Sequence, residues 1–489
     1  MTRRSFSQMS LAQMIAAGSV MAQGRVPPQI PKAMAAMRDA IAKAESDPAR
    51  PVYHFHPPAQ WNNDPNGTIF YRGWHHLFYQ VNPYGATWGH MHWGHARSRD
   101  LVNWEHLPIA LWPSEEQGEE HVFSGAAMPA ADGRPRIFYT SIGKREPEQW
   151  MALPLDDDLI AWEKYAGNPV LSQKIHGEQN VFEWRDPFLF QDGGKTYMVC
   201  GGNHDASRSG GGATVELYEA VKPDLTAWKY RGTVFEYRES EVFNIECPNL
   251  FRLGSKWVLL ISPHRSTEYF VGSLDLERAR FRPETHGTLD PGASYASNIS
   301  RAPDGRTLLW LWGKTDTKPA MGWNGCMAMP RVLSIDGSGF LRQAPAAEFA
   351  TLRGEPRSLG GVALSDSPVS IGDGDCAEIE ATLSVGAANA VGLRIGGKTE
   401  ILFDAKDGVI TAGRARKRIG VMLPLRLRVF IDRRVIEVFT GDGRAAIFTT
   451  SDGADRRIEA FARGGTARIE ECRVWPMKAA RMSLDRFTV

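Results

Sequence analysis

The sequence predicts an all-β chain in which a five-bladed β-propeller is followed by a C-terminal β-sandwich. Two repeated motifs and a late change in strand pattern lead to this prediction. The first motif is a glycine-centred turn that enters a β-branched and aromatic run, and it recurs five times, at 73–79, 133–139, 194–199, 254–261 and 305–312. A turn followed by such a run is typical of a hairpin that enters a buried strand.

The second motif is Asp-Leu-x-x-Trp at 100–104, 158–162 and 224–228, so successive tryptophans lie 58 and 66 residues apart. Sheet units that repeat about every 50 to 60 residues are typical of a propeller, whose blades surround a central channel. The five copies of the glycine turn therefore predict five blades. The alternative is a long β-sandwich in which the turns are evenly spaced by chance.

The pattern changes after residue 345, where both motifs stop. A Gly/Ser-rich passage follows, and residues 346–375 are predicted to be a linker. Alternating strands are then predicted at 377–385, 391–395, 425–430 and 435–439, and residues 376–489 are interpreted as a β-sandwich. We expect a supporting role for this domain, with carbohydrate contact or dimerisation as the alternatives.

Three carboxylates occupy one position in the repeat, which makes them candidates for catalysis. Asp64, Asp186 and Glu246 each precede the glycine turn of a blade by eight or nine residues, and Ser124 and Asn298 take the equivalent place in the other two blades. Equivalent positions near a propeller axis converge on the channel. Clustered carboxylates are the usual equipment for breaking a glycosidic bond.

At these motifs the chain resembles glycoside hydrolase family 32, which contains invertases, levanases and inulinases. The resemblance is carried by ordered segments over about residues 50 to 475: Trp61 to Gly67, Phe78-Tyr79-Gln80, Trp88-Gly89-His90 to His95, Phe123-Ser124-Gly125, Arg185-Asp186-Pro187, Glu246-Cys247-Pro248 and Pro330-Arg331. It implies a five-bladed propeller followed by a sandwich. Two residues depart from the family pattern, Asn62 in place of the usual Met and Asn249 where many relatives carry Asp.

The resemblance also assigns roles to residues. It implies that Asp64 is the nucleophile, Glu246 the acid/base and Asp186 the stabiliser of the transition state. The sugar contacts that it suggests are Asn63, Gln80, Trp88, Phe123, Ser124, Arg185 and Trp312, although Trp310 and Trp312 are so close that either could belong to the core.

The protonation states follow from residue types. Arg185 and the donor-rich Asn-Asp-Pro-Asn-Gly turn should keep Asp186 and Asp64 ionised, whereas two neighbouring anions should raise the pKa of Glu246 and keep it protonated. Each acid taken alone has a simpler interpretation: Asp64 as part of a turn, Arg185 and Asp186 as a surface ion pair, and Glu246 as a solvated strand end.

Composition narrows the class of protein. The chain has 489 residues, 43% of them hydrophobic, and a formal net charge of +1 without a dense basic block. This length predicts at least two domains, and nucleic acid is excluded as a partner because it requires a basic field. No cofactor is expected, and the five cysteines form no Cys-x-x-Cys pair. His90, His92 and His95 invite a metal site, but their spacing fits no zinc pattern, so none is predicted.

The N-terminal region predicts export. Thr2-Arg3-Arg4-Ser5-Phe6 resembles a twin-arginine motif, and a weakly apolar stretch follows, so residues 1–24 are predicted to be a signal peptide and the protein periplasmic or extracellular. An ordinary basic tail is the alternative. Residues 25–50 are predicted to hold a helical strap, and residues 51–345 the catalytic propeller. No stretch of 18 apolar residues exists, so no membrane span is expected.

The clustered carboxylates predict a glycosidase, and the family resemblance implies a retaining enzyme that releases fructose from sucrose, levan or inulin. A fructosyltransferase would use the same residues, and a non-catalytic carbohydrate-binding propeller is the alternative from another class. The sequence does not indicate which sugar is preferred or whether the protein is an oligomer.

Overall fold

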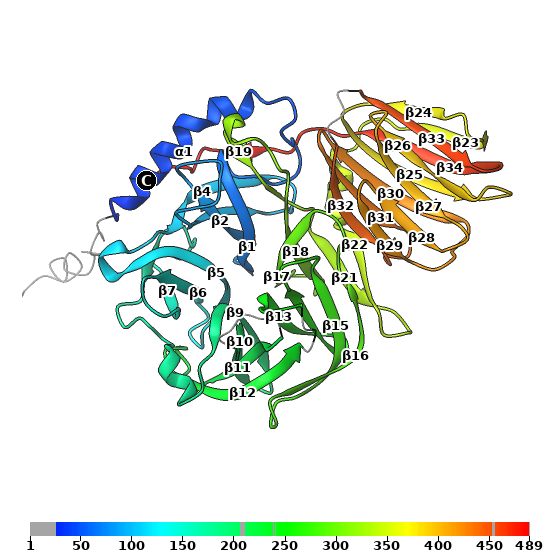
Figure 1. Cartoon of the computed structure of the whole chain (residues 1–489). Helices are drawn as coiled ribbons and strands as arrows, with labels where there is room; N and C mark the ends of the chain where they lie inside the picture. The colour runs from blue at the N-terminus through cyan, green and yellow to red at the C-terminus, as the bar shows by residue number, and fades with distance from the viewer. Residues whose placement is uncertain (1–25, 206–210, 238, 240, 452–454, 489) are drawn as a thin grey trace, which may run out of the picture.

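The computed structural model describes residues 26–205, 211–237, 239, 241–451 and 455–488. The predicted signal peptide, residues 1–24, lies outside this part of the chain. Strands dominate the described residues, which form seven sheets and one long α-helix (Figure 1). The all-β prediction is confirmed.

Five of these sheets surround a common centre, as blades of a propeller do (Figure 1). Their innermost strands contact one another in a closed ring, from β1 to β5, β9, β13, β17 and back to β1.

The strands of the five sheets have the following bounds. The first sheet contains β1 (Gln60–Tyr71), β2 (Trp74–Asn82), β3 (His92–Ser98), β4 (Trp104–Leu111), β19 (Trp323–Asn324) and β35 (Met482–Ser483). The second contains β5 (Glu119–Pro129), β6 (Pro135–Gly143), β7 (Glu148–Pro154) and β8 (Trp162–Lys164). The third contains β9 (Phe182–Asp192), β10 (Lys195–Asn203), β11 (Ala213–Ala220) and β12 (Trp228–Tyr237). The fourth contains β13 (Glu246–Leu253), β14 (Lys256–Ser262), β15 (Glu268–Asp275) and β16 (Arg280–Thr288). The fifth contains β17 (Ser294–Arg301), β18 (Thr307–Gly313), β20 (Cys326–Met327), β21 (Arg331–Ile335) and β22 (Leu341–Pro345). Short 3₁₀ helices lie at η2 (Glu115–Gln117), η3 (Gln173–His176), η4 (Pro319–Met321) and η5 (Ala347–Leu352).

The two sequence motifs meet at the contacts between blades. In each Asp-Leu-x-x-Trp copy the Leu has a positive φ, near 60°, and the Trp indole N–H donates to the carbonyl of that Leu. This turn starts the outermost strand and points its Trp at an aromatic ring of the neighbouring blade's glycine-turn motif. The pairs are Trp104 with Trp310 at 5.8 Å between ring centres, Trp162 with Phe78 at 5.5 Å and Trp228 with Phe138 at 5.6 Å.

Helix α1 (Gln29–Glu45) covers the stretch where a helical strap is expected. Its apolar face buries Ile30, Ala33, Met34 and Met37, which pack with residues of the first and fifth blades. No helix among the described residues is long and apolar enough to cross a membrane.

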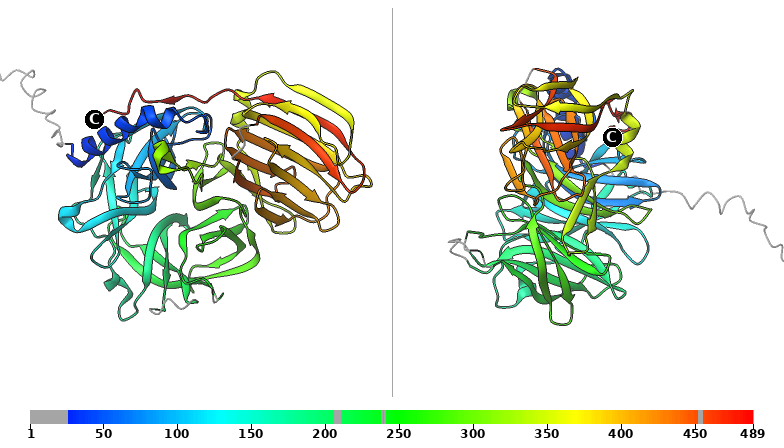
Figure 2. Two further views of the ribbon diagram at one scale, coloured as in Figure 1. Left: turned by 45° about the horizontal axis from the view of Figure 1, so that its top comes forward. Right: turned by 90° about the vertical axis from the view of Figure 1, so that its right-hand side faces the viewer.

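The sandwich lies beside the propeller rather than over its centre (Figure 2). One of its sheets contains β23 (Arg357–Leu364), β25 (Cys376–Ser384), β30 (Leu425–Asp432), β31 (Val435–Thr440), β32 (Ala446–Thr450) and β34 (Ala467–Pro476). The other contains β24 (Val369–Asp373), β26 (Ala390–Ile395), β27 (Thr399–Asp404), β28 (Val409–Ala412), β29 (Ala415–Arg418) and β33 (Arg457–Arg463).

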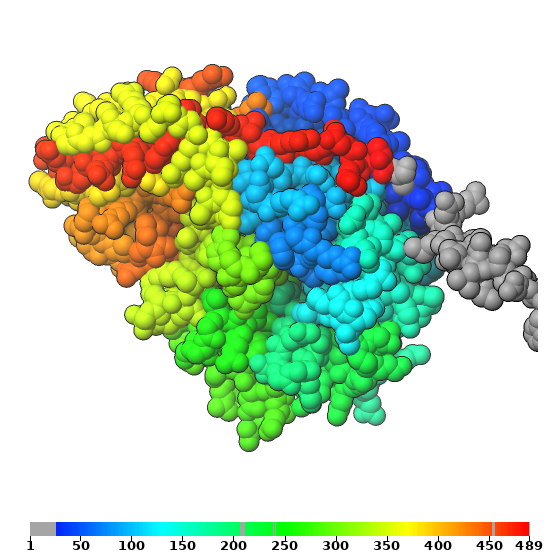
Figure 3. Space-filling model, turned by 180° about the vertical axis from the view of Figure 1, so that it is seen from behind, coloured from blue at the N-terminus to red at the C-terminus, as the bar shows by residue number. Residues whose placement is uncertain are grey.

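Two expectations for this region are wrong. The segment expected to be a linker, 346–375, instead supplies η5 and the edge strands β23 and β24 of both sandwich sheets. The Gly/Ser-rich composition predicts a linker, but it also suits an edge strand. Such a strand is held by backbone hydrogen bonds and leaves many of its side chains exposed. The sandwich was also expected to extend over residues 376–489. Instead, the end of the chain leaves the sandwich and runs across the first blade (Figure 3), where β35 pairs in parallel with β4.

Buried charges join the two domains. The Arg331 guanidinium contacts Asp290 and Glu437 at 2.8 Å each, and all three side chains are fully buried. The His54 imidazole lies between Asp432 and Glu437, at 2.9 and 3.1 Å. Burial lowers the pKa of His54, but these two carboxylates outweigh it and raise the pKa to about 9. These buried groups therefore pair their charges and hydrogen bonds with one another, as charged groups removed from water must.

Candidate active site

An irregularity in every innermost strand forms the site. The pairing register shifts in β1 between Asn62 and Pro65, in β5 between Val122 and Gly125, in β9 near Asp186, in β13 between Glu246 and Asn249, and in β17 between Tyr295 and Ser297. Such bulges re-aim side chains and are common beside active sites. Three residues at these bulges have a positive φ: Asp186 at 61°, Cys247 at 45° and Ala296 at 47°.

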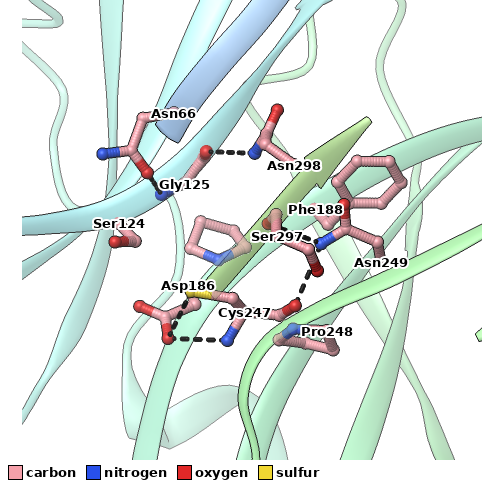
Figure 4. A pocket seen from close by; sticks show the side chains of 11 residues that line it. Asn66, Ser124, Gly125, Asp186, Phe188, Cys247, Pro248, Asn249, Ser297 and Asn298 are labelled. Carbon is pink, nitrogen blue, oxygen red and sulfur yellow. Dashed lines mark hydrogen bonds between the residues drawn. The ribbon is translucent and has the colours of Figure 1, made fainter. Parts of the chain in front are cut away.

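The three predicted catalytic carboxylates meet around Cys247. The Cys247 backbone N–H donates to Asp186 Oδ2 at 2.9 Å, as Figure 4 shows. Its thiol Sγ lies 3.5 Å from Asp64 Oδ2 and 3.7 Å from Asp186 Oδ2. Glu246 is the neighbour of Cys247 in the chain, so strands from three blades bring their acids to one place.

Asp64 is held by a chain of polar side chains. Its Oδ1 accepts a hydrogen bond from Asn63 Nδ2 at 3.0 Å, and its Oδ2 accepts one from Ser124 Oγ at 2.5 Å. Asn63 also donates to Gln80, which donates to Ser124 at 2.9 Å. Gln80 and Ser124 are only 3% and 2% exposed. These three predicted sugar contacts therefore orient Asp64, and their contact with a sugar remains a prediction.

Glu246 makes an ion pair with an arginine and accepts a hydrogen bond from a hydroxyl group. Arg185 Nη2 donates to its Oε1 at 2.8 Å, and the Tyr295 hydroxyl donates to its Oε2 at 2.7 Å. His264 Nδ1 lies 3.7 Å from Oε2. Sequence reasoning missed Tyr295, although a signal was available: it lies three residues before Asn298, which was expected at the channel. Asn298 itself lies deeper and binds Thr68 and the Gly125 carbonyl.

The pKa shifts of Glu246 and of the two aspartates run opposite to the expected directions. Burial raises the pKa of Glu246, but the charges of Arg185 and His264 and the donated hydrogen bonds outweigh it, so the net pKa is lowered. Burial raises the pKa of Asp186 to about 7, against the opposing charge of Arg185. Burial also raises the pKa of Asp64, with the Ser124 hydrogen bond opposing and the charge of Glu246 adding to the increase. The physical reason is that the Arg185 guanidinium bonds to Glu246 rather than to Asp186.

The space beneath the carboxylates is too small for a sugar. It measures about 10 Å³ and is lined by Asn66, Ser124, Asp186, Cys247, Asn249, Ser297 and Asn298, among others (Figure 4). This is room for about one water molecule. The Asn249 amide donates to the carbonyls of Cys247 and Ser297 at 2.9 and 3.1 Å, which explains why an amide suits this position. A sugar must therefore approach from where the Asp64 and Glu246 side chains are partly exposed.

Exposed aromatic rings are linked to the carboxylates through Phe123, the neighbour of Ser124, and through Trp312, which packs near Cys247. Trp88 is 51% exposed, and its ring centre lies 6.1 Å from that of the partly exposed Phe123. Trp312 is partly exposed and packs edge-on against Trp61 at 5.5 Å. Of Trp310 and Trp312, Trp310 is the one that belongs to the core, because it is only 1% exposed. Exposed indole faces suit the apolar faces of sugars.

Among the residues that the structure describes, no group of three His, Cys, Asp or Glu side chains is arranged to hold a metal ion. His76 and His95 are buried and bond to each other at 3.0 Å, and His92 bonds to the His90 carbonyl.

A propeller that gathers three carboxylates under exposed indole rings is a glycosidase by fold and site. Residues 54–345 match the glycosyl hydrolases family 32 N-terminal domain, and residues 348–476 match the C-terminal domain of that family. The chain belongs to glycosyl hydrolases family 32.

Individual relatives agree with this assignment. The chain is 30% identical to a levanase of Bacillus subtilis over 88% of its own length and 70% of the levanase. It is 31% identical to a sucrose-6-phosphate hydrolase of Zymomonas mobilis, over 92% and 97% of the two chains. A solved β-fructofuranosidase from Bombyx mori superposes with a TM-score of 0.81 and 27% identity, over 94% of this chain and all of the other.

Proposed function

We propose that this protein hydrolyses β-fructofuranosides with retention of configuration, using Asp64 as nucleophile, Glu246 as acid/base and Asp186 as stabiliser. The chain is a β-fructofuranosidase-type glycosidase that releases fructose. The observation that supports the mechanism is the gathering of all three carboxylates around Cys247. Two close carboxylates allow a covalent fructosyl-enzyme intermediate, which water then hydrolyses.

The surroundings of each acid fit its proposed role. Asp64 is partly exposed, and two donors hold its oxygens in place for attack on the fructosyl carbon. Asp186 is 5% exposed and bound by a backbone N–H, so it suits electrostatic support of the oxocarbenium-like centre. The Glu246 side chain is 24% exposed, so it reaches the side from which the sugar enters. There it can protonate the departing oxygen.

The first product anomer tests this mechanism. We expect NMR of the hydrolysis of sucrose to show β-fructofuranose as the first sugar released, before mutarotation. Two displacements, first by Asp64 and then by water, restore the starting configuration. An α anomer as the first product would show a single displacement by water and would overturn the role of Asp64 as nucleophile.

The pH profile of kcat/KM is expected to be bell-shaped. Its acid limb follows Asp64, which must be ionised and whose pKa is raised by burial. Its alkaline limb is expected near pH 7, where the carboxylate cluster loses the proton that Asp186 holds in the free protein. A bound sugar excludes water from Glu246, which raises its pKa and lets the cluster's proton serve as the catalytic acid.

Tyr295→Phe separates the contribution of Glu246 to this limb. Loss of the donated hydrogen bond destabilises the Glu246 anion and raises the pKa of Glu246. Because the coupled carboxylates share the last proton, the cluster holds it more tightly and the alkaline limb moves to higher pH. Tyr197→Phe, in the third blade, removes a hydroxyl elsewhere and serves as the control. If the pH profiles of Tyr295→Phe and Tyr197→Phe coincide, Glu246 does not contribute to the alkaline limb.

Substrate preference and location are further proposals. The preferred sugar among sucrose, levan and inulin is best determined by incubating the protein with each and sizing the products, which also separates hydrolysis from fructosyl transfer.

We propose export by the twin-arginine route, because Arg3 and Arg4 precede an apolar stretch. Fractionation of cells that express the full chain tests this, with Arg3→Lys/Arg4→Lys as the variant that should stay inside.

A further inference from the structure

Lys314 lies at the edge of the active site, with its ammonium over two aromatic rings. Lys314 directly follows β18, and its backbone N–H donates to the Ala293 carbonyl at 2.8 Å. Its ammonium lies 4.3 Å from the ring centre of Tyr295 and 5.1 Å from that of Trp312. Within the described residues this ammonium makes no ion pair and no hydrogen bond. Three N–H donors on a half-buried side chain are therefore available.

The position of Lys314 relative to Glu246 indicates which part of a substrate it faces. Tyr295, whose ring supports the ammonium, donates its hydroxyl hydrogen bond to Glu246. In the proposed mechanism Glu246 protonates the glycosidic oxygen, so the leaving group must lie beside Glu246. Asp64 attacks from the opposite face of the fructosyl carbon. Lys314 thus contacts the same tyrosine ring that hydrogen-bonds Glu246, on the side where the leaving group departs.

The other cations near Glu246 are already engaged. Arg185 uses Nη2 on Glu246, and it uses Nη1 on the carbonyl and carboxylate of Glu183. The His264 ring lies against Phe243, and its Nδ1 is 3.7 Å from Glu246 Oε2. The charges that act on Lys314 come from Asp64, Glu246 and Asp316, and burial lowers the pKa of its ammonium against them.

We propose that Lys314 is a specificity-determining residue that hydrogen-bonds the hydroxyl groups of a sugar leaving group. Cation–π contacts with Tyr295 and Trp312 hold the ammonium in place without using its donors. The enzyme then favours fructosides whose leaving group is itself a sugar, such as a glucosyl or fructosyl unit, over those with an aryl leaving group. This inference rests on the proposed function and extends it to the choice of leaving group.

The test compares two substrates in Lys314→Met and Lys314→Arg. On sucrose we expect Lys314→Met to lower kcat/KM by about 10- to 100-fold, the effect of one or two hydrogen bonds to a charged group. On an aryl β-fructofuranoside, which offers no leaving-group hydroxyls, we expect no more than about a 3-fold change, the scale of a modest change in charge. Lys314→Arg keeps the charge and the donors and should recover most of the loss on sucrose.

Other results would overturn the inference. Equal losses on both substrates would mean that Lys314 acts only through its charge on the carboxylates, and an unchanged sucrose rate would mean that it touches no leaving group. If Lys314→Met lowers the melting temperature, Lys314→Leu, which also has no hydrogen-bond donor, replaces it, and the same ratio of rates decides. A native protein that cleaves neither substrate would instead overturn the proposed function, and this inference with it.

Discussion

Asp64→Asn is expected to abolish fructose release while the fold is kept. Asn has the shape of Asp but no nucleophilic charge, and no other carboxylate shares the hydrogen bonds from Asn63 and Ser124 that aim Asp64. Loss of a nucleophile that acts together with its partners costs on the order of 10⁴-fold or more in kcat. Reducing-sugar release from sucrose measures this loss.

The control for this variant is Asp157→Asn. Asp157 forms a surface ion pair with Arg72, and both side chains are more than half exposed. Both variants should melt like the native protein, and only Asp64→Asn should be inactive. Turnover near the native rate in Asp64→Asn would assign the nucleophile to another group.

Glu246→Gln is expected to lose much more rate on a poor leaving group than on an activated one. General acid catalysis contributes about 10²- to 10⁴-fold, and an activated aryl leaving group departs with little need for a proton. Because Glu246 also acts as the base in the second step, the activated substrate should give a burst of aryl product followed by slow turnover. Stopped-flow absorbance on an aryl β-fructofuranoside, beside steady-state rates on sucrose, measures both effects.

Glu183→Gln is the matched control, because Glu183 also binds the Arg185 guanidinium, at 2.7 Å. It shares the arginine, but it is not one of the three carboxylates that meet around Cys247. Glu183→Gln should therefore slow both substrates alike and only slightly. If Glu246→Gln slowed the first step on both leaving groups by the same factor, the acid would have to be sought elsewhere.

The sequence by itself determined the architecture and the identity of the acids. Repeated local patterns carry this information, because each blade buries the same faces and must use the same residue types. Trp104, Trp162 and Trp228 recur for this reason, and each starts an outermost strand and packs on the neighbouring blade. The carboxylates were found in the same way, since equivalent positions of a closed ring converge on its axis.

The tertiary structure alone decided how the side chains of the site are used. A bulge and a positive φ at Asp186 break the alternation of β9, so Arg185 reaches Glu246 on the next blade. This reverses the expected order of pKa values. Tyr295 was missed because its partner lies 49 residues away and becomes its neighbour only when the blades close. The strands at 357–373 were missed because their pairing depends on partner strands about a hundred residues later, which local composition does not reveal.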